Sequence, residues 1–444
     1  MSQDQRRSVK RLIAPVKRLL TADRAVPAAR IGTETDPDTV LSGAAVDRDT
    51  AGRETDPRDF EATDVHLSAA LPPDVALLRV TSTQFKGRRC VQLHFHHKGK
   101  VAVAASEREL GTQYVRDIRV ADLVTRAKDQ NANGKADAWG EAYDQVRAAW
   151  SSMGTLVMWL RGFLADQDAP KLVVWDDTGD EMPWELFKFE GKVAGAERQG
   201  WLGELIPVVR WTSVLDGARM WTYDASPDGC EGGVLVSEDI EFDAGLGDAS
   251  SALSPYEVEA RTRSMHALYR RLMEDIPEVA LVVARYHGHR GDDGRNSRLG
   301  KSSLDRLSDP MPGLARAGAI VLLNGCNTAR PVGADGRSFA EVFLRRGARG
   351  VIATTGDISI DHSHDFAARL MEACVRDHVV IAEQLMRHRA EYARRVALAN
   401  QEEDRAPYAA EFEGFFDAYT YVYFGHPYAR LRICPPRGGT GDDE

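Results

Sequence analysis

Cysteine is scarce in this chain of 444 residues, with five present at positions 90, 230, 326, 374 and 434. They are odd in number and far apart, and no two of them form a CxxC pair. This pattern argues against a disulfide framework and against a zinc site. We therefore expect reduced thiols, which are typical of a cytoplasmic protein.

Long hydrophobic runs and an excess of positive charge are also missing. No segment reaches the roughly 18 consecutive apolar residues of a membrane-spanning helix, and the N-terminus has no apolar core of a secretory signal. The chain has 57 basic and 67 acidic side chains, a formal net charge of −10. Because this charge repels phosphates, we expect a cytoplasmic protein without a nucleic-acid partner.

The first 64 residues differ in composition from the rest. Residues 1–24 place leucine, isoleucine and valine at helical spacing among basic side chains, which predicts a basic amphipathic helix. Such a helix can lie on an anionic membrane, but Pro15 interrupts it, and we favour docking on the protein itself or on a partner. Residues 25–64 are polar and acidic, which predicts a disordered linker.

The remainder of the chain predicts an α/β fold in two halves. Residues 65–215 start with a pair of strands, followed by helical stretches over about 117–128 and 138–166 and by the strand "KLVVWDD". Residues 216–434 alternate continuous apolar strands with helices, which is typical of a parallel sheet covered on both faces. Residues 435–444 are predicted to be a tail.

Two strands of the second half end in residues capable of nucleophilic chemistry. "VALVVARYHGH" ends with His287 and Gly288, and "AIVLLNGCNTA" places Cys326 directly after an apolar run. Carboxyl ends of parallel strands meet at one edge of a sheet, so the His and the Cys should lie there together. A cysteine nucleophile needs a nearby base and N–H donors for the oxyanion. Spacing alone leaves the alternative of a structural Cys and a loop His equally open.

These motifs resemble the CHAT family of caspase-like (clan CD) cysteine peptidases. "LVVWDDTGDEMPWELF" (172–187) and "TYVYFGHPYARLRI" (420–433) are similar to two further segments of that family, in the same order. The resemblance covers about 170–434. It implies a caspase-like three-layer fold with a mostly parallel sheet and helices on both faces, in which a non-catalytic half (65–215) packs beside the catalytic half (216–434).

The resemblance assigns roles to individual residues. Cys326 matches the nucleophile and His287 the general acid/base, and the N–H groups of Gly288 and Cys326 match the oxyanion hole. His289 is an alternative catalytic histidine, but Arg290 follows it where the donor glycine would be needed, so we favour His287.

The resemblance also implies a function. It predicts an endopeptidase that cleaves protein substrates with a Cys–His dyad and needs no cofactor. Activation by a separate sensor protein or by self-cleavage is expected, in a bacterial antiphage-defence or programmed-cell-death pathway. The alternative is a non-catalytic CHAT module that serves as a scaffold for a partner, against which the intact His287, Gly288 and Cys326 argue.

Two acidic residues follow the strand after Cys326, in "TTGDISIDHSHD". Asp357 or Asp361 could face a cationic side chain on the substrate residue before the cleaved bond (P1), since a paired charge in a dry pocket discriminates strongly. The alternative is that they cap or solvate the next helix.

A second pattern, "DQNANGKADAWGE" (129–141), resembles a calcium loop. Asp129, Asn131, Asn133 and Asp137 stand at positions 1, 3, 5 and 9 of the EF-hand scheme, with a glycine at position 6. Position 12 lacks the usual glutamate. The alternative is an Asn/Gly-rich turn between two helices, and calcium is the one metal that the sequence suggests.

Overall fold

The computed structural model describes residues 71–85, 88–105, 120–149, 154–176, 178, 182–212, 230–238, 253–276, 278–286, 311–330 and 338–436. All of these belong to one compact unit, Phe60–Glu444. The expected helix of residues 1–24, the linker of residues 25–64 and most of the tail lie outside the described residues.

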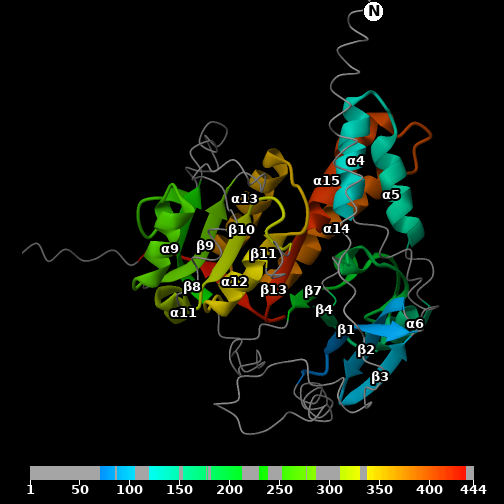
Figure 1. Cartoon of the computed structure of the whole chain (residues 1–444), viewed down its shortest axis with the longest axis horizontal. Helices are drawn as coiled ribbons and strands as arrows, with labels where there is room; N and C mark the ends of the chain where they lie inside the picture. Colours follow the sequence, from blue (N-terminus) through cyan, green and yellow to red (C-terminus); the bar gives the residue numbers. More distant parts are fainter. Residues whose placement is uncertain are drawn as a thin grey trace, which may run out of the picture. The chain divides into compact units, whose positions relative to one another are not determined.

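Among the described residues, twelve strands form one mixed sheet in the order β12-β14-β8-β9-β10-β11-β13-β7-β4-β1-β2-β3 (Figure 1). Their bounds are β1 Val75–Phe85, β2 Arg88–His97, β3 Lys100–Ala105, β4 Lys171–Asp176, β7 Val208–Trp211, β8 Cys230–Glu238, β9 Val279–Arg285, β10 Ile320–Asn324, β11 Gly350–Thr354, β12 Val379–Val380, β13 Tyr421–Gly425 and β14 Arg430–Ile433. Strands β5 (Lys188–Val193) and β6 (Ala196–Trp201) form a separate hairpin.

The sheet is mostly parallel, as the sequence predicts, but its strand direction reverses once in the middle. Strands β14, β8, β9, β10 and β11 run parallel to one another. Strand β13 is antiparallel to β11, and β7, β4 and β1 follow the direction of β13. The carboxyl ends of β8–β11 therefore share one edge of the sheet with the start of β13.

Helices cover both faces of β8–β11, which confirms the predicted α/β architecture. Counted over all described residues and not only at these strands, the helices are α4 Val120–Ala132, α5 Ala138–Ala149, α6 Gly154–Ala165, α7 Leu202–Leu205, α9 Met265–Met273, α11 Pro312–Ala317, α12 Phe339–Arg345, α13 Ile360–Arg376, α14 Ile381–Ala399 and α15 Ala409–Thr420. Helix α13 packs on one face through Phe366 and Leu370. Helices α9, α11 and α12 pack on the other.

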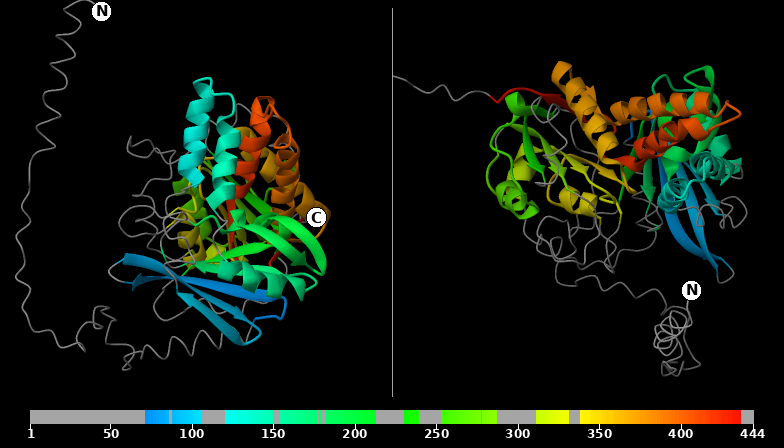
Figure 2. Two further views of the ribbon diagram at one scale, coloured as in Figure 1. Left: turned by 90° about the vertical axis from the view of Figure 1, so that its right-hand side faces the viewer. Right: turned by 90° about the horizontal axis from the view of Figure 1, so that it is seen from above.

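The chain's last helices also build the core of its first half. The second part of α14, together with α15, shares a hydrophobic cluster with α4–α7 and with β1, β4 and β7, and Figures 1 and 2 show α15 beside α4 and α5. Strand β13, which follows α15, lies between β11 and β7. The two sequence halves are thus joined through one sheet and one set of helices.

Side-chain caps mark the starts of the two helices that flank β11. Ser359 caps α13 through a hydrogen bond from the His362 N–H, and Ser338 and Glu341 form a capping box on α12. The helical stretch expected over 138–166 contains α5 and α6, and residues 150–153 between them lie outside the described residues.

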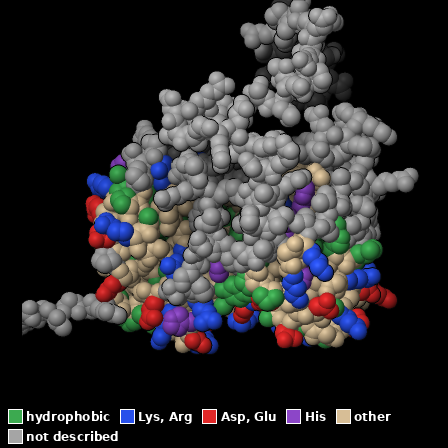
Figure 3. All heavy atoms as spheres, turned by 90° about the horizontal axis from the view of Figure 1, so that it is seen from below, with side chains coloured by type: hydrophobic (Ala, Val, Ile, Leu, Met, Phe, Trp, Pro, Cys, Tyr) green, Lys and Arg blue, Asp and Glu red, His purple; other side chains and the backbone are tan. Residues whose placement is uncertain are grey.

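Figure 3 shows one face of the surface, where Lys/Arg and Asp/Glu side chains of the described residues lie interspersed. None of the described helices combines the length and hydrophobicity that crossing a membrane requires.

Candidate active site

Cys326 lies half-buried on a tight turn directly after β10, at the edge where β8–β11 end. The next residue, Asn327, has a φ of +58°, a left-handed conformation that asparagine tolerates. A Cβ on Gly325 would lie 2.7 Å from the carbonyl oxygen of Tyr286. Only glycine allows this close approach, which brings the end of β9 next to the residues that precede Cys326.

His287 and Gly288 lie outside the described residues, as does His289. The described part of that segment ends at Tyr286, directly before His287. The Cys–His dyad and the oxyanion hole therefore stay predictions from the sequence.

Two buried threonines tie the Cys326 turn to the end of β11. The backbone N–H of Thr354 donates to the Thr328 hydroxyl over 3.0 Å, and the Thr328 N–H lies 3.4 Å from the Thr354 hydroxyl. The Thr354 hydroxyl also donates to the Gly325 carbonyl oxygen. Buried hydrogen bonds of this kind are costly to break, so the turn is held in one position.

The sulfur of Cys326 contacts the segment that follows β11. The Ile358 N–H lies 3.5 Å from Sγ, and the thiol lies 3.8 Å from the Ile358 carbonyl oxygen. Burial raises the pKa of the Cys326 thiol and the charges of Asp357 and Asp417 raise it further, although the Ile358 backbone lowers it in part. Within the described residues, the thiol is therefore held in its protonated form.

The two acidic candidates occupy different positions relative to the thiol. Asp357 is exposed, accepts a 2.7 Å hydrogen bond from the Asn327 side chain, and is close enough to affect the Cys326 pKa. Asp361 is exposed in the first turn of α13. The structure thus brings Asp357, and not Asp361, into the surroundings of Cys326.

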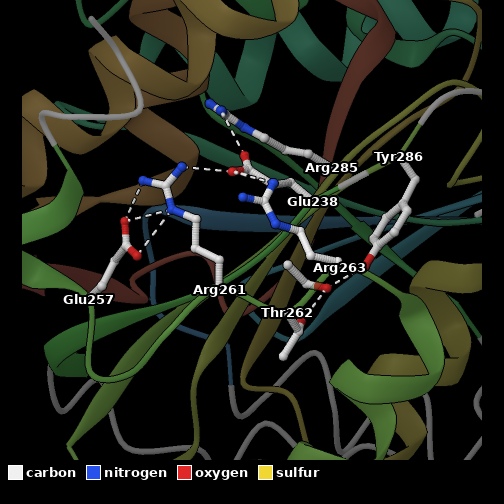
Figure 4. A network of polar contacts seen from close by, with 8 residues as sticks. Glu238, Glu257, Arg261, Thr262, Arg263, Arg285 and Tyr286 are labelled. Atoms are coloured by element: carbon white, nitrogen blue, oxygen red, sulfur yellow. Dashed lines mark hydrogen bonds and ion pairs between the residues drawn. The ribbon is translucent and has the colours of Figure 1, made fainter. Parts of the chain in front are cut away.

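A buried charged group lies at the ends of β8 and β9 (Figure 4). Glu238 accepts a 2.7 Å hydrogen bond from Arg261 and lies 3.8 Å from the Arg285 guanidinium. Glu238 and Arg285 are fully buried, and within the described part of the chain the nitrogens of Arg285 have no hydrogen-bond partner. Burial lowers the pKa of Arg285.

Sequence analysis missed this group, although two charged residues at the ends of otherwise apolar strands were a visible signal. Arg285 pairs in register with Asn324, two residues before Cys326. The group therefore lies beside the candidate site.

A histidine pair anchors α13 on α14. The Nε2 atoms of His362 and His388 lie 3.1 Å apart in a buried aromatic cluster with Phe366, Tyr392 and Tyr421. Burial lowers the pKa of His362 to about 4 and that of His388 well below its ordinary value. Both rings are therefore neutral in the folded protein.

Because both histidines are buried in their neutral form, we expect the folded protein to lose stability in acid. A histidine in the unfolded chain has a pKa of about 6.5, so the unfolded state binds more protons between pH 4 and 6.5. Stability should be complete above that window and fall as the pH decreases through it. His388→Gln should flatten the dependence of the melting temperature on pH in this window by roughly half, because one of two titrating groups is removed. An unchanged slope would contradict the assignment.

The calcium-like segment forms the turn between α4 and α5. Gly134 has a φ of +85°, and the N–H groups of Lys135 and Gly134 donate to the carbonyl oxygens of Gln130 and Asn131, which is a Schellman motif. Asp129 and Asn131 lie within α4, Asn133 is in the turn, and Asp137 forms an ion pair with Arg405. No group of three or more metal-ligating His, Cys, Asp or Glu side chains occurs in the described part of the chain. Calcium binding stays a prediction.

Comparisons with known proteins favour a peptidase. Residues 248–432, which include Cys326, match the family model of Peptidase family C25. No curated protein matches the chain in sequence. Two crystal structures of the Saccharomyces cerevisiae separase–securin complex are similar at 10% identity, with TM-scores of 0.48 and 0.47. The match covers 84% of this chain and 31% of the yeast chain, so this chain spans about a third of its length.

The C25 match covers less than half of the chain and indicates a class of protein for the matched segment. The matched segment runs from before α9 to β14 and carries the Cys326 turn at the end of a parallel strand. It is similar to a family of cysteine peptidases in clan CD, and this supports a clan CD cysteine peptidase as the class of the chain.

Proposed function

We propose that the chain is a CHAT-type cysteine endopeptidase in which Cys326 is the nucleophile and His287 the general acid/base. One observation carries the proposal: Cys326 lies on a braced turn at the carboxyl edge of a parallel sheet, within the segment that matches a peptidase family. Sites of α/β sheets gather at this edge. The CHAT type and a role in bacterial defence or cell death rest on the sequence motifs.

The proposed reaction proceeds by acyl transfer. His287 takes the thiol proton while Cys326 Sγ attacks the carbonyl carbon of the scissile bond, and the N–H groups of Gly288 and Cys326 stabilise the oxyanion. The C–N bond then breaks, the leaving amine takes the proton from His287, and a thioester forms. Water, deprotonated by His287, hydrolyses the thioester and restores the thiol.

The raised pKa of Cys326 bears on regulation. Most reactive cysteines have lowered pKa values, and a buried, protonated thiol is inert. This favours a latent enzyme that an activator switches on, and it also favours the second candidate function, a non-catalytic scaffold for a partner protein. The two candidates differ in whether any condition makes Cys326 cleave a peptide bond.

The deciding experiment is mass spectrometry of new protein N-termini. Purified protein is mixed with a bacterial proteome, and wild type is compared with Cys326→Ala, each with calcium and with a chelator. New termini in the wild-type samples alone would establish the peptidase and identify P1, and a calcium requirement would support the 129–141 site. The same termini in all samples, also after addition of host lysate as a source of activator, would favour the scaffold.

Asp357 is proposed to select a cationic P1 residue. Asp357→Asn should lower kcat/KM for substrates with arginine or lysine at P1 by about 100-fold, because one charge in the recognition site is lost. Substrates with an uncharged P1 residue should change little, and Asp361→Asn is the matched control. A larger effect from the Asp361 variant would transfer the role to that residue.

A further inference from the structure

Asp417 is a buried carboxylate next to the candidate site that the proposed reaction does not use. It lies in the last turn of α15 and is 1% exposed. Its Oδ2 atom accepts hydrogen bonds from the Ser359 hydroxyl (2.6 Å) and the Ser359 N–H (3.2 Å). Its Oδ1 atom is buried and has no hydrogen-bond partner among the described residues. Since burying an incompletely paired carboxylate is unfavourable, a functional reason for it is to be expected.

Ser359 connects Asp417 to the sulfur of Cys326. Its neighbour Ile358 contacts Sγ through both the backbone N–H and the carbonyl group. The Ser359 hydroxyl also accepts from the His362 N–H over 3.3 Å and so caps α13. A shift of Ser359 would therefore move the Ile358 backbone away from the thiol.

The residue directly after α15 also contacts the segment that leads into the Cys326 turn. Tyr421, the first residue after α15, donates a 2.5 Å hydrogen bond from its hydroxyl to the Asn324 side chain. Asn324 donates in turn to the Ser363 carbonyl oxygen on α13 over 3.0 Å. The start of α13, the end of α15 and the Cys326 turn are therefore one connected unit.

We propose that Asp417 is a positioning residue: its carboxylate holds Ser359, and through it Ile358, against the Cys326 sulfur. This proposal rests on the proposed peptidase function. The Ile358 N–H stabilises the thiolate, and its position also limits where the sulfur can lie. Small displacements of reacting groups lower rates strongly. Loss of this contact should therefore lower kcat more than it changes KM.

The ionisation of Asp417 adds a dependence on pH. Burial raises its pKa to about 6, while the Ser359 hydrogen bonds and Lys128 lower it and Glu413 raises it. Cys326 and Tyr421 also face this carboxylate. Below pH 6 the group is protonated and accepts hydrogen bonds more weakly. Activity should therefore fall on the acid side with a midpoint near that value.

The test is a double-mutant cycle with pH profiles. Asp417→Ala and Ser359→Ala should each lower kcat by about tenfold with KM within twofold, and the double variant should lose no more than either, because both remove one connection. Asp417→Asn keeps an oxygen that accepts from Ser359 but cannot titrate, so it should retain kcat at pH 7 within a few-fold and lose the Asp417 part of the acid limb, leaving the part that protonation of His287 causes. Glu411→Gln, in the first turn of α15, is the matched control.

Two results would overturn the inference: additive losses in the cycle, or an acid limb in Asp417→Asn with the same midpoint and steepness as in wild type. A merely structural role would lower the melting temperature of the variants without changing the pH profile. The rate at which iodoacetamide alkylates Cys326, followed by mass spectrometry, reports the ionisation of the thiol without a substrate. Ser359→Ala should shift the pH midpoint of this alkylation rate upward. If the alkylation midpoint shifts but no proteolysis is found, the result counts against the proposed peptidase function and not against the positioning role of Asp417.

Discussion

Cys326→Ala is expected to lower kcat for peptide hydrolysis by about 10³- to 10⁶-fold, because removal of a nucleophile leaves only the binding and oxyanion contributions to catalysis. The fold should persist. Cys326 is half-buried, and its turn is braced by Thr328 and Thr354 and not by its own side chain. Initial rates on a peptide identified from the new N-termini, together with melting temperatures, provide the measurement.

Two other cysteines are matched controls for this prediction. Cys374 is fully buried on α13, where burial raises the pKa of its thiol to about 12, so it is inert. Cys434 directly follows β14, and its thiol donates a hydrogen bond to Glu231 on β8. The substitution Cys434→Ser keeps a donor at this position. Cys374→Ala and Cys434→Ser should keep full activity. If Cys434→Ser removed activity while Cys326→Ala kept it, the nucleophile would be misassigned.

The sheet and the Cys326 turn could be predicted because their signals are local. Strands β9, β10 and β11 are continuous apolar runs, and every residue of the three is buried, as expected for strands covered on both faces. Gly325 and Cys326 follow such a run directly, so their place at the carboxyl edge could be inferred without knowing which helices lie above it.

Contacts between distant segments could not be predicted in this way. Nothing in the sequence around Asp417 indicates that it lies against Ser359, since that contact depends on how α15 packs beside α13. The reversal of direction at β13 is equally hidden, because a buried strand has the same composition in a parallel and an antiparallel position. The charge of Arg285 was visible, but its complete burial depends on the elements packed around it.

The motif at 172–187 turns out to be structural in the described residues. Asp176 accepts a 3.0 Å hydrogen bond from the Trp184 ring nitrogen, and Glu185 accepts one of 2.9 Å from Arg210 on β7. Arg210 also donates to the Met182 carbonyl oxygen over 2.8 Å. Asp176 and Glu185 therefore fasten η3 (Trp184–Leu186) to the sheet.

Glu185→Ala is expected to destabilise the protein by about 3–5 kcal/mol, because it leaves the buried Arg210 without the carboxylate to which it donates hydrogen bonds. Burial alone would raise the pKa of Glu185, but the charge and hydrogen bonds of Arg210 outweigh it and lower that pKa. The side chain is therefore ionised in the folded protein, and Arg389 from α14 also depends on its charge. Urea unfolding provides the measurement.

Two variants separate the buried charge from the lost packing. The double substitution Glu185→Met with Arg210→Met should recover the part of the loss that comes from Arg210, since replacing a whole buried ion pair by apolar side chains is often neutral. The part that comes from Arg389 should remain. Glu190→Ala, on the exposed face of the neighbouring strand β5, should stay within about 0.5 kcal/mol of wild type. If the double variant were as unstable as Glu185→Ala, lost packing or the uncompensated Arg389, and not Arg210, would explain the effect. The buried pair would then act through its shape, and the Pro-Trp-Glu segment would be held mainly by Trp184.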